Sequence, residues 1–335
     1  MGEGICQIDN KASFWKFTIP QLCIEESAVK HAIVALGAAF RDYRSSTSRD
    51  ETSGHYGKAM AILGRTVAPS VVTTLVCCLA FLIIQCLQRN WKEALVHLKS
   101  GLTIIKHQVL MVNLDRPADP TAELENDTDT DYIIRVFCML ELSASIKWRF
   151  EPIIARLRAR PARGLGVSKL HDRRDAHKAV ETFCRDVCAW KWDAKGDYAK
   201  RGSELLDIGQ QLEEKLQSFK GSAVDASLEV DMLHVAFWKE LARVTAYGPA
   251  HPPEAEACKN IVRVAEDVRR IWGLEKRQFK LGTTILPPLY FVVRNCSCKE
   301  TRELALNIAR GWMQQENFWD GTDGWLRPGW EVKET

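Results

Sequence analysis

Apolar residues recur along most of the chain at alternating three- and four-residue steps, the spacing that places side chains on one face of an α-helix. No run of useful length alternates as a strand does, and no Asn-Gly or Asp-Gly pair joins two apolar runs as a hairpin. The sequence therefore predicts an all-α fold of stacked antiparallel helices with irregular connectors. The expected apolar faces are Tyr56, Met60, Leu63 and Val67; Trp91, Leu95, Leu98, Leu102 and Ile105; Ala176, Val180, Phe183, Val187 and Trp190; Leu205, Gly209, Leu212, Leu216 and Phe219; Cys258, Val262, Ala265, Val268 and Trp272; and Leu304, Ile308 and Trp312.

Residues at the expected helix starts support this assignment. Asn90 precedes Trp91, and Asp172 precedes the helix that runs to Trp190; both side chains can accept backbone N–H groups of a first turn. Pro69 fits the first turn of the next apolar segment, where a missing N–H costs little.

The segment between Arg65 and Arg89 carries no charge and reads VVTTLVCCLAFLIIQCLQ in its apolar part. A membrane span needs about 20 apolar residues. This run is shorter and contains Thr73, Thr74 and Gln85, and amphipathic helices flank it. These features favour a buried core helix, and we expect no contact with a membrane.

Two irregular stretches interrupt the helical pattern. Residues 115–131 are acidic and contain Pro117 and Pro120, which predicts a solvated connector. Residues 161–169 contain Gly164 and Gly166 and predict a loop. We expect one helical domain over 1–335, with possible sub-lobes at 20–114 and 129–320. The part from His55 to Lys106 is similar to a tetratricopeptide unit, but no period repeats through the chain, so a regular solenoid is not expected.

Bulk composition excludes several classes of protein. The chain has 335 residues and a formal net charge of +3, so it has no strong overall attraction to nucleic acid or anionic membranes. Its 11 cysteines lie mostly in apolar helical segments, where free cysteine behaves as a small hydrophobe. We expect reduced thiols and a cytosolic or nuclear protein. The N-terminal residues do not read as a signal peptide or a myristoylation site.

The candidate metal sites in the sequence are incomplete. Cys184 and Cys188 are one helical turn apart, and one residue separates Cys296 and Cys298, but neither pair has a second pair to complete a zinc site. The acidic run from Asp127 to Asp131 starts like a calcium loop, then has Tyr132 where Gly is needed and Cys138 where Glu is needed. Alternating carboxylates in a loop also fit poorly with a magnesium cluster. We expect no metal and no cofactor.

The sequence shows no assembled catalytic motif, so we expect no enzyme. It contains no Gly-x-Ser-x-Gly, no His-Glu-x-x-His and no phosphate-binding loop, and its eight histidines are scattered. Arg156–Arg174 is basic without a recognisable DNA-reading module, which favours a solvated face. The C-terminal tail carries Phe318, Trp319, Trp325 and Trp330 and is expected to fold back on the core; an exposed partner-binding segment is the alternative.

Several segments resemble the regulatory region of fungal zinc-cluster transcription factors, particularly those found beside biosynthetic gene clusters. The family's first helix reads roughly R/K-H-A-I-x-A-L-G-A, and its second begins with Tyr. Its next pair reads L-Q-G-N-x-x-A-A-x-x-H-L-x-S-G, in which Arg89 replaces the usual Gly. The matching residues are Lys30, His31, Ala32, Ile33, Ala35, Leu36, Gly37 and Ala38; Tyr56; Leu87, Gln88, Asn90, Ala94, His97, Leu98, Ser100 and Gly101; Pro288, Leu289, Tyr290, Phe291 and Cys296; and Glu316, Trp319 and Asp320.

The resemblance implies a nuclear transcription regulator or co-regulator, controlling a biosynthetic gene cluster. Family members bind DNA through an N-terminal six-cysteine, two-zinc cluster, and Cys6 and Cys23 cannot make one. Direct DNA binding is therefore not expected of these residues. The expected partners are other transcription regulators or co-regulators, and a small-molecule effector is a further possibility. The alternative is an enzyme or ligand-binding protein of a biosynthetic pathway, built on the same helical scaffold.

Overall fold

The structure is a computed structural model of the chain. It describes residues 14–45, 51–115, 129–147, 150–155, 167, 170–192, 198–221, 226–248, 250–272 and 285–312. Within these ranges all regular elements are helices and no strand occurs, so the all-α prediction is confirmed. The chain divides into two compact units, with the boundary inside α7 between Ala144 and Ser145.

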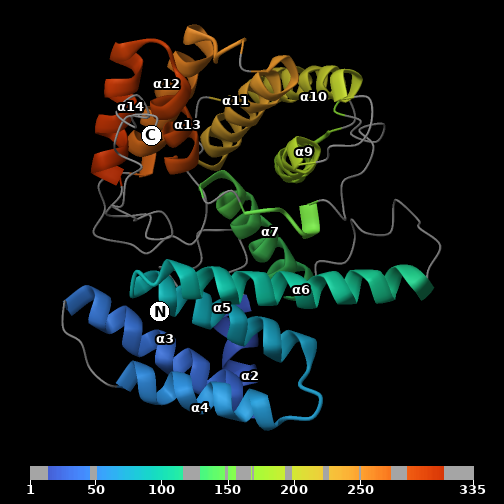
Figure 1. The fold of residues 1–335 in the computed structure, drawn as a ribbon, viewed down its shortest axis with the longest axis vertical. Helices are drawn as coiled ribbons and strands as arrows, with labels where there is room; N and C mark the ends of the chain where they lie inside the picture. The colour runs from blue at the N-terminus through green and yellow to red at the C-terminus, as the bar shows by residue number, and fades with distance from the viewer. Residues whose placement is uncertain are drawn as a thin grey trace, which may run out of the picture. The chain divides into compact units, whose positions relative to one another are not determined.

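Unit 1 is built around α5, and Figure 1 shows its helices α2 to α6 in blue and teal and α7 in green. Fourteen residues of α5 are buried around its whole circumference, which explains why it has almost no amphipathic pattern. It packs against α3, α4 and α6, while α2 and α4 also pack on α3. The elements are the π-helical turn η2 (Phe14–Thr18), α2 (Ile19–Glu25), α3 (Ser27–Ser45), α4 (Glu51–Arg65), α5 (Val71–Leu87), α6 (Trp91–Asp115) and the first part of α7 (Asp129–Lys147).

The start of unit 1 is attached to α7 by aromatic and polar contacts. Phe14 is fully buried against Tyr132, with ring centroids 4.9 Å apart. Trp15 Nε1 donates to the Tyr132 hydroxyl at 3.1 Å, and Thr18 Oγ1 donates to Asp129 Oδ2 at 2.6 Å. Asp129 therefore belongs to a helix, although the sequence places it in the acidic connector. Residues 116–128 of that connector lie outside the described residues.

Unit 2 is organised by α11, which packs against α9, α10, α12 and α13. Phe237 of α11 and Phe291 of α13 meet edge to face at 5.5 Å, which joins these two helices at the core. The helices of unit 2 are α9 (Arg173–Trp192), α10 (Tyr198–Ser218), α11 (Ala226–Tyr247), α12 (Ala255–Trp272), α13 (Leu286–Asn295) and α14 (Lys299–Trp312).

The uncharged segment after Arg65 forms the central helix of unit 1, as predicted. No helix in the described ranges has the length and apolar character needed to cross a bilayer. The predicted role of Pro69 is wrong, because α5 begins two residues later. Ser70 is the N-cap: its Oγ accepts from the Thr73 N–H at 3.1 Å, so Pro69 lies before the cap. The Asp172 cap is confirmed, since its Oδ1 accepts from the Asp175 N–H at 2.8 Å.

Most residues of the expected apolar faces are buried, and Tyr56, Leu63, Trp91, Leu95 and Phe219 are partly buried. Met60 and Leu304 are about half exposed and Val67 is fully exposed. Val67 lies beyond Arg65, where α4 ends, so helical spacing no longer controls its direction. Met60 lies at the edge of a face of α4 that no described part of the chain covers.

Two glycines inside helices have opposite surroundings. A Cβ at Gly101 of α6 would lie 2.2 Å from Cε1 of the Phe137 ring, so only glycine allows α6 and α7 to approach this closely. A Cβ at Gly57 of α4 would meet nothing within 4 Å. Gly101 stands where the resembling family pattern has a glycine. Its close approach to Phe137 is a physical reason for glycine at this position.

These surroundings predict opposite effects of the same substitution. Gly101→Ala should lower the free energy of unfolding by about 1–3 kcal/mol, because the Phe137 ring must shift in a packed core. Gly57→Ala should raise it by about 0.5–1 kcal/mol, because alanine is the better helix former and nothing obstructs its methyl group. Urea denaturation of both variants measures the difference, and equal effects of the two substitutions would contradict the packing described here.

Candidate functional site

The residues that carry the family pattern in unit 1 come together at the α4–α5–α6 junction. The Tyr56 hydroxyl of α4 and Nε2 of His97 in α6 are 2.7 Å apart, and both rings contact Phe81 of α5. Burial lowers the pKa of His97 and raises the pKa of Tyr56. Both groups are therefore neutral near pH 7, and the imidazole tautomer decides which of the two donates the hydrogen bond. This hydrogen bond links α4 to α6 across α5.

The turn from α5 to α6 explains a second part of the pattern. Asn90 N–H donates to Gln85 O at 2.9 Å, and Arg89 N–H donates to Cys86 O at 3.1 Å. These two bonds form a Schellman motif, in which the residue after the helix takes a left-handed conformation. That residue is Arg89, with φ of 62°. The Asn90 side chain, predicted to cap the first turn of α6, donates to Gln85 Oε1 at the end of α5 at 3.0 Å. The Asn90 carbonyl accepts from the Ala94 N–H of α6.

A second histidine contact joins α3 to α4. Nδ1 of His31 and Nδ1 of His55 are 2.9 Å apart, so one nitrogen donates and the other accepts. Partial burial and the nearby charges of His55, Lys58 and Lys30 lower the pKa of His31. Lys30 and Lys58 also disfavour a cation here. The His31–His55 hydrogen bond therefore joins α3 to α4, and the lowered pKa of His31 favours the neutral form of that residue.

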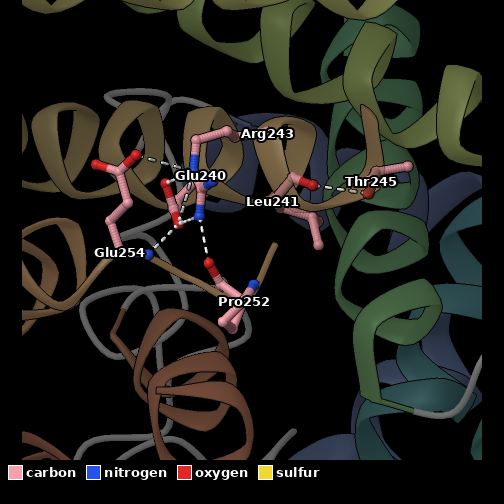
Figure 2. Close-up of polar contacts among 6 residues, drawn as sticks. All are labelled: Glu240, Leu241, Arg243, Thr245, Pro252 and Glu254. Carbon is pink, nitrogen blue, oxygen red and sulfur yellow. Dashed lines mark hydrogen bonds and ion pairs between the residues drawn. The ribbon is translucent and has the colours of Figure 1, made fainter. Parts of the chain in front are cut away.

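Figure 2 shows the main polar centre of unit 2, at the connection between α11 and α12. The Glu240 carboxylate is only 5% exposed and accepts from Arg243 Nη2 at 2.7 Å and from the Glu254 backbone N–H at 2.8 Å. Arg243 also donates to the Pro252 carbonyl at 2.6 Å. The hydrogen bond from Glu240 raises the pKa of Arg243. This ion pair ties residues 252–254 to α11 and satisfies a backbone donor at the start of α12, which is a structural role.

A buried carboxylate also joins α9 to α11. Asp231 Oδ1 is 2.8 Å from Nδ1 of His177, and Asp231 Oδ2 accepts from Arg173 Nη1 at 3.3 Å. The other ring nitrogen of His177 faces Glu181 at 3.5 Å, so the histidine lies between two carboxylates. A histidine that is oriented by a carboxylate resembles part of a catalytic triad, but here its second ring nitrogen lies 3.5 Å from Glu181, which is a carboxylate and not a nucleophile such as Ser or Cys. Arg173 belonged to the predicted solvated basic face, and its guanidinium is instead engaged by α11.

The cysteines of unit 2 are buried or hydrogen-bonded. Cys184 is buried, which together with Asp231 and Glu181 raises its pKa well above the ordinary value, so its thiol is unreactive near pH 7. Cys188 Sγ is 3.3 Å from Ser145 Oγ, and both atoms are buried. The Cys298 thiol donates to Glu300 Oε2 at 3.1 Å. In the part of the chain that the structure describes, the cysteines are free and no three metal-binding side chains are grouped as a metal site.

Several predicted features lie outside the described residues. These are the calcium-like start at Asp127, most of the basic stretch before Lys169, and the aromatic tail from Phe318. The sequence analysis missed Asp231, Glu240 and Arg243. Their signal was a charged residue within an apolar helical run, such as Glu240 and Arg243 in AFWKELAR, which indicates a buried ion pair.

In each unit, the polar side chains described above connect neighbouring helices. This chain belongs to the family of the fungal specific transcription factor domain, whose model matches residues 4–183, more than half of the chain. The matched range includes His31, Tyr56, Arg89, His97 and Gly101. No curated protein and no solved structure matches the chain.

The left-handed conformation at Arg89 predicts that glycine is the better residue there. Arg89→Gly should be more stable than Arg89→Ala by about 1 kcal/mol, because both variants lose the side chain and only alanine keeps a Cβ in the left-handed region. Thermal denaturation of the two variants measures the difference. If Arg89→Ala equals or exceeds Arg89→Gly in stability, the turn does not require positive φ.

The two histidines with lowered pKa predict loss of stability in mild acid. Below the ordinary pKa of 6.5, the unfolded chain binds protons at His31 and His97 that the folded chain does not bind. The free energy of unfolding therefore falls as pH falls through that window. We expect Tm to decrease between pH 7.5 and 5.5, and to decrease less in the double variant His31→Gln, His97→Gln. An unchanged slope in the double variant would contradict the assignment.

Proposed function

We propose that these 335 residues regulate transcription by contacting other proteins or an effector, and that they act in the nucleus. The observation that carries the proposal is membership of the fungal specific transcription factor domain family over residues 4–183. Control of a biosynthetic gene cluster is part of the proposal and is supported by the pattern shared with factors found beside such clusters.

The chemistry of the described side chains supports action by contact. Two buried carboxylates of α11, Glu240 and Asp231, pair with Arg243 and His177 and connect α11 to neighbouring segments. Enzymes need a nucleophile or general base within reach of a bound substrate. The Cys184 thiol interacts electrostatically with Asp231 of this pair, and burial raises its pKa well above the ordinary value, which makes it a poor nucleophile. These contacts favour the regulatory proposal over the alternative of an enzyme on the same scaffold.

Direct reading of DNA is not part of the proposed activity. The 335 residues contain no six-cysteine zinc-cluster motif, and the charges on α12 are nearly balanced. On that helix Arg263, Arg269 and Arg270 share the two carboxylates of Glu266 and Asp267, so most of their charge is compensated locally. Phosphate binding needs uncompensated positive charge. The proposed partners are therefore other transcription regulators or co-regulators, with a small-molecule effector as a further candidate.

A tethering experiment tests the proposed function. The full chain is fused to an unrelated DNA-binding domain in a fungal host that carries a reporter gene with the matching sites. The proposal expects reporter output to rise or fall severalfold relative to the DNA-binding domain alone. The variant Gly101→Leu, whose side chain collides with Phe137, should lose this effect, whereas Gly311→Leu in open space should keep it.

The same proposal makes a negative expectation for the purified chain. Titrated alone with promoter DNA at physiological salt, it should show no sequence-specific binding. A stably expressed fusion that leaves the reporter unchanged, or nanomolar specific DNA binding by the chain alone, would sink the proposal.

A further inference from the structure

One face of α4 consists of small residues that are exposed in the part of the chain that the structure describes. Gly54, Gly57, Ala61 and Gly64 are all exposed, and a Cβ at any of the three glycines would meet no atom within 4 Å. We call this set the glycine face. Figure 1 shows α4 running beside α3, which covers its opposite side. Glycine weakens an exposed helix, and no contact in the described chain requires it at these positions.

The spacing of the glycine face is the same in both directions along the helix. Its members are separated by three, four and three residues, so the pattern is symmetric about the level of Ala59. If two copies of α4 cross antiparallel about a two-fold axis at that level, Gly54 meets Gly64 and Gly57 meets Ala61. Small residues would then face small residues along the whole contact, which allows the two backbones to approach closely. A two-fold interface requires this self-complementarity.

The charges beside the glycine face are complementary in the same arrangement. Glu51, Lys58 and Arg65 follow each other at seven-residue steps, so they form a row along one edge of the face. Antiparallel pairing brings Glu51 of each copy near Arg65 of the other at both ends of the contact. The two Lys58 side chains lie near the axis at the solvent edge, where their long flexible stems can separate the charges.

A groove next to Glu51 could receive an exposed apolar residue from beyond the other end of α4 in a second copy. The groove has a volume of about 690 Å³, and Val67, two residues beyond the end of α4, is fully exposed. In the antiparallel arrangement the end of α4 in one copy, from which the chain continues to Val67, lies beside Glu51 of the other copy and so near this groove. The groove is lined by α3, including Ile33, Val34 and Phe40, and by Glu51 of α4.

We propose that the glycine face is a homodimer interface, in which α4 packs antiparallel against α4 of a second copy and Val67 enters the groove of that copy. The proposed partner is a second copy because three features are compatible with the same two-fold axis. These features are the spacing of the small residues, the charged row, and the groove with Val67. The proposal does not depend on the regulatory function, since it concerns only self-association.

Sedimentation equilibrium of the full chain tests the proposal. We expect a reversible monomer–dimer equilibrium, and we expect Gly57→Leu to weaken association at least tenfold by separating the two helices. Leucine is a better helix former than glycine, so the same variant should unfold at an equal or higher temperature. Loss of association with retained stability separates an interface effect from misfolding. Gly311→Leu, the same change at an open position of α14, is the matched control and should associate like the wild type.

A charge exchange tests the direction of the contact. Arg65→Glu should weaken association, and adding Glu51→Arg should restore most of it, because each end again pairs opposite charges. Glu51 also pairs with Arg41 in its own chain, so the thermal unfolding of both variants is measured alongside. A wild-type chain that stays monomeric at all concentrations, normal dimers of Gly57→Leu, or no recovery in the exchanged variant would each overturn the proposal.

Discussion

The burial of α5 is the constraint on which unit 1 depends. This helix is apolar on every side, so it is stable in water only when other helices surround it. Its neighbours α3, α4 and α6 must therefore be held around it, and the hydrogen bonds between helices serve this purpose. His31 with His55 joins α3 to α4, and Tyr56 with His97 joins α4 to α6. Residues shared with the family thus lie at the contacts that close the core.

In unit 2, buried ion pairs hold the neighbouring helices against α11. Glu240 and Asp231 are carboxylates of α11, and each is compensated by a cation and further donors from neighbouring segments. A buried charge without a partner is costly, so these pairs restrict how α9 and the start of α12 can sit against α11. These pairs also favour one packing of the helices over others, because a different packing would leave a buried carboxylate of α11 without its donors.

The surface of α4 differs from the polar surface that a solvated helix usually presents. Its glycines reduce the intrinsic stability of the helix, and the side chains that α4 does present at its ends are charged or apolar. In a domain whose family regulates transcription, a face that is shaped for a second helix would couple association to regulation. Self-association would also give the chain two sets of surfaces for partner proteins.

The sequence alone determined the all-helical fold and the buried position of α5, because the spacing of apolar residues and the uncharged run are local properties of the chain. It also revealed the family through His31, Tyr56, His97 and Gly101, but not what these residues do. Their roles depend on contacts between distant segments, such as Phe137 against Gly101 and Tyr56 against His97. The same limit applies to Met60 and Val67, whose apolar character predicted burial. Only the tertiary structure decides which face of a helix is covered, since that depends on where the neighbouring helices lie and not on the spacing within one helix.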